Sequence, residues 1–548
     1  MIQFTGRRLL AKMVGNSSWL LLQVLALVAG AHGASILGLF TSLSPSHLVI
    51  QMSMARILAE RGHNVTVVTT LKPPSLHKNI THILVPLEEN DLQAFSVLVG
   101  GLTKKENSNS HLTMLRSVGQ MSEAFSKMGS VMKHQKVRDL YEHPDNSFDL
   151  VIVGYFMNSF QLALAHKLKV PQVVALSNPP SLLGDVLGNP REVSYVPSMQ
   201  LATEPGPMGF GKRVVNLLSS LGHRLFTFVL EQGNARTYRE IYGDDPSLPS
   251  YGDLNKNISL VFFASHGISE GPIRPNVPAV IEVGGIQVKD RPDPLPRDIE
   301  EFLRDTPHGA ILLSLGSNLK KEHLQPDTVR KMFNVVSKLK QKVVWKWDDL
   351  ENTPGRSENI LFLKWLPQDD ILAHPNISLF ITHAGKGGVT EAQYHGKPML
   401  ALPVFGDQPT NADAMQKQGF GLSQSILALE EASFLEGIQE VLGNPKYAQA
   451  VKSFSALYRD RPMSARETFV YWVEYVIRHR GAPHLQSPVV HMTYIAANNI
   501  DVYALLLVAI AAVIFISKLV FCFTLKKLKS ALKKSQSNNN RKLSKKKR

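Results

Sequence analysis

The chain has 548 residues, a net charge of +15 and a single cysteine, Cys522. Its length allows two or three domains that each bury a full core, and the cysteine count excludes a small scaffold stabilised by disulfides. A surplus of positive charge is typical of nucleic-acid binding, but here it lies in residues 1–33, at Lys518 and in residues 526–548, so residues 34–501 are neutral and that class is disfavoured.

Residues 1–33 are predicted to be a secretory signal peptide. Three basic residues precede an apolar run from Trp19 to Ala29, and the small residues Ala31 and Gly33 stand just before Ala34. This order of basic, apolar and small residues is typical of an export signal that is cleaved. The chain that follows is therefore expected to leave the cytosol.

Residues 34–285 are predicted to form a first α/β domain. Short apolar runs rich in β-branched residues alternate with helical stretches, the first of which ends near Arg61. Such alternation predicts βαβ units and a parallel sheet. The expected strands are Ser35–Phe40, Val65–Thr70, Leu150–Val153 and Gln172–Ala175.

His47 is the first candidate for chemistry. It ends the sequence Ser44-Pro-Ser-His47, directly after the first predicted strand. Ligands of doubly wound sheets bind outside the carboxyl ends of the strands, and this place favours a functional role. The alternative is that a histidine near a helix start is a capping or surface residue.

The stretch Phe210–Leu230 predicts an amphipathic helix. Basic residues are interleaved with apolar side chains at helical spacing, among them Val215, Leu218 and Leu225. Two interpretations stand: the helix packs on the domain core, or it lies against a membrane and admits lipophilic molecules.

Residues 286–460 are predicted to form a second α/β domain. It begins after Gly285, and the Pro-rich stretch Arg291–Pro296 is typical of a linker. Helical patterns again alternate with apolar runs. The expected strands are Ala310–Leu315, Lys342–Trp347, Ile360–Phe362, Leu379–Thr382 and Met399–Leu402.

The segment Trp365–Gln408 carries the most informative pattern. A glycine-rich turn follows the strand Leu379–Thr382, and the helix Gly388–Tyr394 comes next. His383 lies at the turn and Glu391 lies in the helix. A strand, a glycine turn and a helix N-terminus together form an anion site, because unpaired backbone N–H groups and the helix dipole point at the ligand.

Two other patterns in this half are weaker. The run Gly385-Lys-Gly-Gly388 has neither the spacing nor the Lys-Ser/Thr ending of a P-loop. The pair Asp348-Asp349 resembles the paired acids of metal-dependent glycosyltransferases, but it lacks the D-x-D spacing and a solvated turn is expected there. No metal site is predicted.

The order Trp365-x-x-Gln368, His383, Glu391 and Asp407-Gln408 resembles the signature of the UDP-glycosyltransferases, the family that includes the animal UDP-glucuronosyltransferases. The resemblance implies an α/β fold of GT-B type, in which two Rossmann-like doubly wound domains face a cleft, with a C-terminal transmembrane helix. It also implies a UDP-sugar as co-substrate and no cofactor. Residues 34–285 would bind the acceptor, and residues 286–460 would bind the UDP-sugar.

The resemblance implies a role for each donor-site residue. Trp365 would stack on uracil, Gln368 would bond to base or ribose atoms, and Glu391 would accept both ribose hydroxyls. Asp407 and Gln408 would bind the hydroxyls of the sugar.

The diphosphate would be held by His383 and by the backbone N–H groups that follow it. The residues implied for this role are Ser317, His383, Gly385, Gly387 and Gly388. Gly387 departs from the family, which often has Asn or His at this place. Lys386 could supply charge to the diphosphate instead, or it could point into solvent.

The resemblance makes His47 the general base. The family completes this site with an Asp after a Phe-Asp-hydrophobic run, but here the run that begins at Phe148 reaches Gly154 at the expected Asp position. Glycine cannot orient an imidazole, so His47 would act through its intrinsic pKa near 6.5, at some loss of rate. Asn158 or a carboxylate from elsewhere could orient the ring.

The C-terminal part predicts a membrane anchor. Within residues 461–501, the stretch Arg466–Arg480 predicts an amphipathic helix that packs back across the first domain. Residues 502–525 are almost wholly apolar and long enough to span a bilayer. The basic tail, residues 526–548, belongs on the cytosolic side. A single-pass type I membrane protein with a lumenal catalytic body is expected.

Two further patterns concern the compartment. The ending Lys545-Lys-Lys-Arg548 resembles a dilysine retrieval signal of the endoplasmic reticulum, although the tail could simply bind anionic lipid. Glycosylation sequons stand at Asn64, Asn79, Asn257 and Asn376. Asn79 and Asn257 are the better candidates, because the other two precede predicted strands.

These expectations combine into one function and one rival. The chain would transfer glucose or glucuronate, with glucose preferred, from a UDP-sugar to a hydroxyl of a small lipophilic acceptor. A single displacement would invert the α-linked donor to a β-glycoside. The rival is a catalytically impaired membrane protein that binds UDP-sugar or a lipophile, which Gly154 keeps open. A homo-oligomer is also considered.

Overall fold

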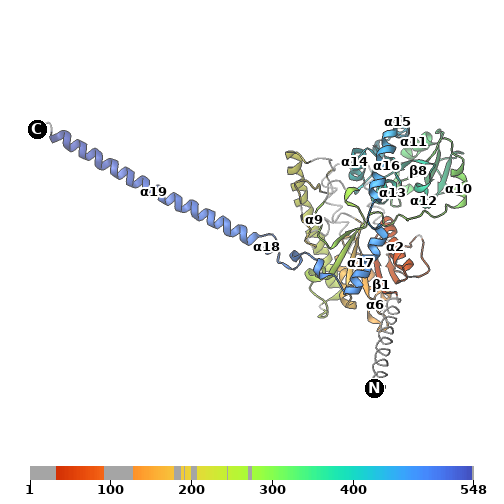
Figure 1. The fold of residues 1–548 in the computed structure, drawn as a ribbon, viewed down its shortest axis with the longest axis horizontal. Coiled ribbons are helices and arrows are strands. Elements are labelled where there is room, and N and C mark those ends of the chain that lie inside the picture. The colour runs from red at the N-terminus through yellow and green to blue at the C-terminus, as the bar shows by residue number, and fades with distance from the viewer. Residues whose placement is uncertain are drawn as a thin grey trace, which may run out of the picture. The chain divides into compact units, whose positions relative to one another are not determined.

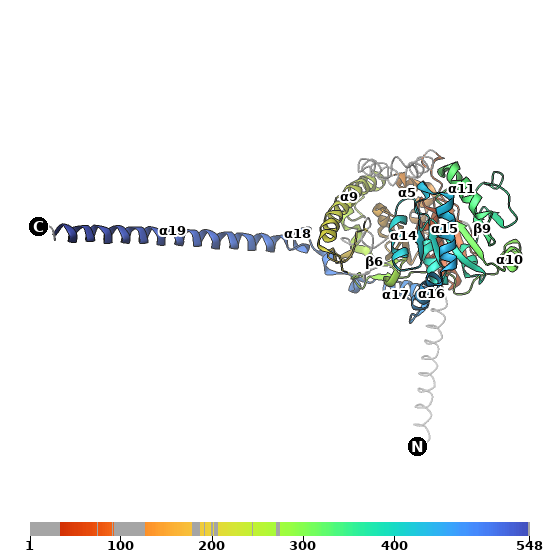
Figure 2. The same ribbon diagram turned by 90° about the horizontal axis from the view of Figure 1, so that it is seen from above.

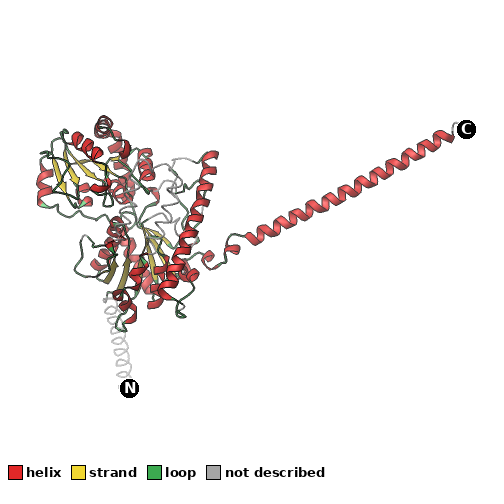
Figure 3. Ribbon diagram, turned by 180° about the vertical axis from the view of Figure 1, so that it is seen from behind, coloured by secondary structure: helices red, strands yellow, loops and turns green. Residues whose placement is uncertain are grey.

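The computed structural model describes residues 33–73, 75–89, 91, 127–177, 187–190, 192–198, 201, 207–243, 245–269 and 274–545. Residues 1–32 of the predicted signal peptide and residues 546–548 of the predicted retrieval signal lie outside this part. The chain divides into two compact units, one up to Ser487 and the other from Pro488. Figure 3 shows the strands of the first unit in two separate groups, each with helices around it.

The first sheet contains seven parallel strands in the order β3-β2-β1-β4-β5-β6-β7. All four strands predicted here are confirmed to within two residues, and the central ones are buried on both faces, as expected of a parallel sheet covered by helices. The order reverses between β1 and β4, so a ligand is expected at their carboxyl ends. The strands are β1 Ser35–Phe40, β2 Asn64–Thr69, β3 Ile80–Leu84, β4 Leu150–Tyr155, β5 Gln172–Leu176, β6 Ile258–Phe263 and β7 Val280–Glu282.

The second sheet contains six parallel strands in the order β10-β9-β8-β11-β12-β13. The five strands predicted for this half are confirmed to within two residues. Here the order reverses between β8 and β11, which places the turn after β8 beside the turn after β11. The strands are β8 Ala310–Ser314, β9 Lys342–Lys346, β10 Ile360–Leu363, β11 Ile377–Thr382, β12 Met399–Ala401 and β13 Gly421–Ser423.

Helices flank both sheets. In the first half they are α2 Pro45–Glu60, α5 Gly129–Lys133, α6 Gln135–Glu142, α7 Ala163–Leu168 and α9 Phe210–Tyr242, with short 3-10 turns η2 Ser159–Leu162, η4 Tyr251–Asn257 and η5 Gly267–Ser269. In the second half they are α10 Arg297–Arg304, α11 Pro326–Val336, α12 Gln368–Ala373, α13 Lys386–His395, α14 Gln408–Lys417, α15 Glu431–Gly443 and α16 Pro445–Arg459, with η6 Lys321–His323 and η7 Ile426–Ala428. Helices α11 and α15 share one core with β8 and β9 (Figure 2).

Helix α17, Ala465–His479, returns from the second half of the chain to the first. Its side chains Phe469, Val473 and Val476 are fully buried in the same core as α2, β1 and β6. Figure 1 shows this blue helix beside the red α2. Burying three such side chains contributes roughly 1.5–3 kcal/mol each. The salt bridge between Arg466 and Glu60, 2.8 Å long, adds a polar contact to the same interface.

Helix α9 combines two environments. Its C-terminal half buries Leu230, Asn234 and Tyr238, so packing on the core holds there. Its N-terminal half leaves a row of apolar side chains between 42% and 76% exposed. These side chains are Phe210, Val214, Val215, Leu217, Leu218, Leu221, Leu225, Phe228 and Val229. Packing on the core thus applies to the C-terminal half of the helix, and contact of the exposed side chains with a membrane stays a prediction.

The second unit consists mainly of one long helix. After η8 Pro483–Leu485, η9 Pro488–His491 and α18 Tyr494–Ala497, α19 runs over Ile500–Lys545. Within its segment Ile500–Asn540, a window of 18 residues has a mean hydropathy of 2.8, and the helix is long and apolar enough to cross a membrane. The predicted apolar span thus forms a continuous helix.

Candidate active site

His383 directly follows β11, and its ring lies between two glycines. A Cβ atom added to Gly316 would come within 2.5 Å of Cε1 and Nε2 of the ring, and one added to Gly385 would come within 2.4 Å of Nε2. Only glycine leaves room for the imidazole on both sides. Gly316 also has a φ of +82°, which residues with a side chain rarely adopt. The two turns are therefore shaped around this ring.

The imidazole of His383 is neutral at physiological pH. Burial and the charge of Lys346 lower its pKa to about 4. Its Nδ1 has no hydrogen-bond partner among the residues that the structure describes. A buried polar atom without a partner costs roughly 1–3 kcal/mol, so a ligand oxygen that bonded to it would be stabilised here.

Lys346 is a cation of this site that the sequence analysis did not select. It ends β9, and its Nζ donates a hydrogen bond of 2.9 Å to the carbonyl oxygen of Gly316. Burial lowers its pKa. The sequence does place Lys346 at the carboxyl end of a predicted strand. Its position near His383 follows only from the strand order, which puts β9 next to β8.

The N-terminus of α13 is open to an anion. The helix begins at Lys386, two residues earlier than predicted, because glycine's low helix propensity hid its first turn. Gly385 is the N-cap and provides no side-chain cap, so the N–H groups of the first turn and the helix dipole face the turn after β11, where the N–H of Lys386 acts on the carboxylate of Asp407. Nothing lies within 4 Å of a Cβ atom placed on Gly387. Gly387 and Gly388 thus belong to a helix end suited to phosphate.

Gln368 and Glu391 are brought together, as two residues that serve one nucleoside would need to be. Gln368 begins α12, and its Nε2 donates a hydrogen bond of 2.6 Å to Oε2 of Glu391 on α13. Burial, with the charges of Asp369 and Asp370, raises the pKa of Glu391 to about 8. Trp365, three residues before Gln368, is 52% exposed, so a face of its indole is available for stacking.

Asp407 and Gln408 lie at the start of α14, and their side chains differ in the hydrogen bonds that they already make within the protein. Oε1 of Gln408 accepts hydrogen bonds from the backbone N–H groups of Val404 and Phe405, at 2.9 and 3.1 Å. Its oxygen is therefore committed to the loop, and only its amide nitrogen remains for a sugar. The carboxylate of Asp407 accepts a bond of 2.6 Å from Asn411, and burial raises its pKa.

Asn411 and Lys386 connect Asp407 to the glycine-rich turn after β11. Asn411 also donates a hydrogen bond of 3.0 Å to the carbonyl oxygen of Ala384. The backbone N–H and the charge of Lys386 both act on the Asp407 carboxylate. The charge of Lys386, the first residue of α13, thus acts on the carboxylate of Asp407.

Ser317 lies in the turn after β8, and its neighbour Asn318 reaches the first half of the chain. Asn318 Nδ2 donates a hydrogen bond of 3.1 Å to Ser44 Oγ. Ser44 is the N-cap of α2. This contact joins the turn that carries Ser317 to the N-terminus of α2, the helix that carries His47. Sequence reasoning missed Asn318 because the contact spans 274 positions.

His47 is the third residue of α2 and not its cap, which is Ser44. Its ring makes an edge contact with Phe156 at 4.8 Å between centroids. Burial alone lowers its pKa to about 4, with no contribution from a charged group. The imidazole is therefore neutral at physiological pH and able to accept a proton.

The groups left open as partners for His47 can now be placed. The amide of Asn158 donates to the carbonyl oxygen of Gly154 at 3.2 Å and to Gln161 at 2.8 Å, while its oxygen accepts from the N–H of Phe156 at 2.8 Å. Asn158 is thus committed to the turn after β4. Among the described residues, no carboxylate affects the pKa of His47.

The described acids offer no metal centre. No group of three or more His, Cys, Asp or Glu that could hold a metal ion occurs within the described ranges. Asp348 accepts from the N–H of Lys321 at 3.1 Å, and Asp349 accepts from its Nζ at 2.6 Å. This pair organises a turn.

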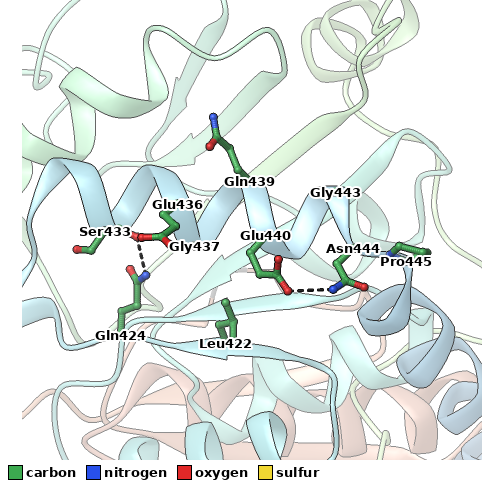
Figure 4. A pocket seen from close by; sticks show the side chains of 10 residues that line it. All are labelled: Leu422, Gln424, Ser433, Glu436, Gly437, Gln439, Glu440, Gly443, Asn444 and Pro445. Atoms are coloured by element: carbon green, nitrogen blue, oxygen red, sulfur yellow. Dashed lines mark hydrogen bonds between the residues drawn. The ribbon is translucent and has the colours of Figure 1, made fainter.

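A polar groove lies elsewhere, beside the edge strand β13. Figure 4 shows its lining side chains, in which Gln424 bonds to the carbonyl oxygen of Ser433 at 2.7 Å and Asn444 bonds to Glu440 at 3.0 Å. None of the candidate donor or acceptor residues lines it. The groove is separate from the site described above.

The chain is similar to known proteins over most of its length. The family model described as "UDP-glucoronosyl and UDP-glucosyl transferase" matches residues 39–535. UDP-glycosyltransferase UGT5 of Dactylopius coccus is 33% identical over 502 residues, which cover 90% of this chain and 93% of that protein. UDP-glucosyltransferase 2 of the same organism is 32% identical with the same coverage.

A solved structure shows the same fold. It is a complex of a UDP-glucosyltransferase from Polygonum tinctorium, 16% identical, with a TM-score of 0.53 over 81% of this chain and 99% of that one. The two parallel sheets and this likeness confirm the GT-B architecture expected from the sequence. From the match to residues 39–535 and the identity to its relatives, the chain belongs to the UDP-glycosyltransferase family.

Proposed function

We propose that the protein transfers a glucosyl group from UDP-glucose to a hydroxyl of a small lipophilic acceptor, with His47 as general base. The observation that carries the proposal is the hydrogen bond between Ser44 and Asn318. It joins Ser44, which precedes His47, to the turn after β8. Gly316 of the same turn packs against the ring of His383, at the proposed diphosphate site. Because the proposed base and the proposed diphosphate site lie on two connected segments, acceptor and donor would be held together for direct transfer of the sugar.

The reaction would be a single displacement. His47 takes the proton of the acceptor hydroxyl while the hydroxyl oxygen forms a bond to the anomeric carbon of the sugar. The bond from that carbon to the diphosphate oxygen breaks, and UDP leaves with the electron pair. Attack opposite the leaving group inverts the α-linked donor to a β-glycoside.

The departing charge would be stabilised by fixed groups of the second sheet. The N-terminus of α13 and the ammonium group of Lys346 both lie beside His383. Such preorganised dipoles and charges stabilise a leaving diphosphate without a metal ion. We therefore propose a metal-independent enzyme that uses no cofactor beyond its co-substrate.

Donor recognition would follow the expected assignment. Trp365 stacks on uracil, Gln368 and Glu391 bind the base and ribose, and Asp407 with the amide nitrogen of Gln408 binds the sugar. Glucose is preferred over glucuronate because Gly154 departs from the usual glucuronosyl pattern, and the relative that is 32% identical is named a glucosyltransferase.

The proposed setting is the membrane of the endoplasmic reticulum. Helix α19 anchors the chain, residues 34–285 bind the acceptor and residues 286–460 bind the donor, with both in the lumen. Lipophilic acceptors concentrate in the bilayer, and the exposed apolar side chains in the N-terminal half of α9 would contact its surface.

The test uses microsomes that contain the full chain. UDP release and glycoside formation are measured with UDP-glucose or UDP-glucuronate and a panel of phenols, for wild type and for His47→Ala. Transfer that disappears in the variant supports the enzyme and identifies the donor. Absence of transfer with every pair, despite measurable binding of UDP-sugar, would favour the non-catalytic binder.

A further inference from the structure

The backbone of Gly154 is covered by a side chain from α2. A Cβ atom added to Gly154 would lie 2.4 Å from Nε2, 2.6 Å from Cδ and 2.9 Å from Oε1 of Gln51. The carboxamide of Gln51 thus occupies the space that any side chain at position 154 would need. Gln51 itself is only 1% exposed.

The oxygen of this carboxamide is unused. Oε1 of Gln51 has no hydrogen-bond partner among the residues that the structure describes. Buried polar atoms are nearly always hydrogen-bonded, and an exception calls for a functional or structural reason. The neighbouring amides do not share this state, because Gln161 bonds to Thr41 at 2.8 Å and Asn158 bonds to Gly154 and Gln161.

Gln51 and His47 lie one turn apart on the same helix. Residues four positions apart share a helix face, with Cβ atoms roughly 5–6 Å from each other. Helical side chains also lean toward the N-terminus of their helix, which favours an approach of the Gln51 side chain to His47; in this structure its carboxamide lies against Gly154. The end of β4 borders both residues, since Gly154 lies under Gln51 and Phe156 contacts the ring of His47.

We infer that Gln51 is the positioning residue of the base: when the acceptor binds, its Oε1, which has no partner among the described residues in this structure, accepts the N–H of one ring nitrogen of His47 and leaves the other nitrogen to take the proton of the acceptor hydroxyl. The inference rests on the proposed function, in which His47 is the base. A carbonyl acceptor selects the tautomer and fixes the ring plane, as an acidic partner would. Gly154 suits this arrangement, because a larger residue at position 154 would displace the amide of Gln51.

The first experiment compares Gln51→Leu with Gln51→Glu in microsomes that contain the full chain. Leucine removes the acceptor at similar volume, and we expect kcat to fall about tenfold or more, out of the roughly 100- to 10,000-fold that a positioned base contributes. The KM for UDP-sugar and the affinity for UDP should stay unchanged. Glutamate should restore kcat and move the acidic limb of the pH–rate profile to higher pH, because a negative charge raises the pKa of a neighbouring histidine.

Gln172→Leu is the matched control. Gln172 is 0% exposed, and its Oε1 also has no hydrogen-bond partner among the described residues. It lies at the start of β5, the opposite end of the same sheet from Gly154. We expect this variant to lose stability without a change in kcat or in the pH profile of the remaining activity.

A second pair of variants tests the space that Gln51 fills. Gly154→Asp alone should lower kcat, since its Cβ atom would collide with the amide of Gln51. Gln51→Ala combined with Gly154→Asp removes the collision and supplies a carboxylate beside His47. We expect the double variant to exceed both single variants in kcat.

The outcomes separate the two proposals. Absence of transfer by the wild type, or transfer that persists in His47→Ala, would overturn the proposed function and this inference with it. Transfer that requires His47 but proceeds at the wild-type rate and pH profile in Gln51→Leu would overturn the role of Gln51 alone. A loss in Gln51→Leu that comes with weaker UDP binding and is not relieved by glutamate would assign Gln51 a merely structural role.

Discussion

The donor side and the acceptor side of the candidate site are built differently, although both lie at the carboxyl ends of parallel sheets. On the donor side, Gln368 bonds to Glu391, and Asn411 bonds to Asp407. On the acceptor side, the described contact of His47 is with the ring of Phe156. The donor site is thus held by polar contacts before any ligand arrives, while the base depends on few neighbours. In the proposed enzyme, the nucleotide would therefore meet a preformed set of polar contacts, whereas the base would have to be oriented by its own helix.

The largest expected effect comes from removing the base. In His47→Ala, the rate of transfer should fall about 100- to 10,000-fold, the usual contribution of a positioned general base. UDP affinity, measured by calorimetry, should not change, because the cradle around His383 stands on the other sheet. Weaker UDP binding in this variant would show that the two sides are not independent.

The next largest effect comes from adding a methyl group beside the ring of His383, at the proposed diphosphate site. Gly385→Ala places a methyl group 2.4 Å from Nε2 of His383, and overpacking of this kind costs about 1–3 kcal/mol. We expect the Kd of UDP to rise about tenfold or more. Gly387→Ala is the comparison, since nothing lies within 4 Å of its added atom, and its effect on the Kd should be smaller. Equal losses in both would contradict the steric explanation.

A smaller effect should come from the contact between the two sides. Asn318→Ala removes the hydrogen bond of 3.1 Å to Ser44, which is worth about 0.5–1.5 kcal/mol. We expect kcat/KM for the acceptor to fall about two- to tenfold, with UDP affinity unchanged. Asn334→Ala removes a comparable bond of 2.7 Å to Glu431 between α11 and α15, and it should leave the rate unaltered.

The last expected effect concerns stability and its dependence on pH and not the rate of transfer. The pKa of Glu391 is raised by burial from 4.5 to about 8, so the folded protein binds more protons than the unfolded chain between these pH values. Stability should therefore be full below pH 4.5 for this group and decline as pH rises toward 8. In Glu391→Gln, thermal unfolding of the ligand-free protein should depend less on pH across this window. An unchanged dependence would show that Glu391 does not carry this proton.

The sequence predicted nine of the thirteen strands that the structure describes, because strand signals are local. All nine expected strands agree with the structure to within two residues, since runs of apolar and β-branched residues bounded by turns mark a buried parallel strand. The N-terminus of α13 was placed two residues late because the run Gly385-Lys-Gly387 resembles a loop more than a helix.

The parts of the site that escaped prediction depend on contacts between distant segments. Lys346 matters because β9 lies beside β8, and Asn318 matters because the turn after β8 meets the loop before α2. Neither fact is visible in local periodicity. Gln408 shows the reverse difficulty, since its resemblance to a sugar-binding residue hid its bonds to the backbone of its own loop.

The late position of helix α17 in the sequence affects how the chain folds during its synthesis on the ribosome. The first sheet ends with β7 at Glu282, but the helix that covers part of its core begins only at Ala465, roughly 180 residues later. At synthesis rates of about 5–20 residues per second, the nascent first half waits roughly 10–40 seconds with that apolar surface uncovered. Residues that complete the earliest domain are thus among the last to emerge, and chaperone binding during this interval should concentrate on the side of α2 and β1 that α17 later covers.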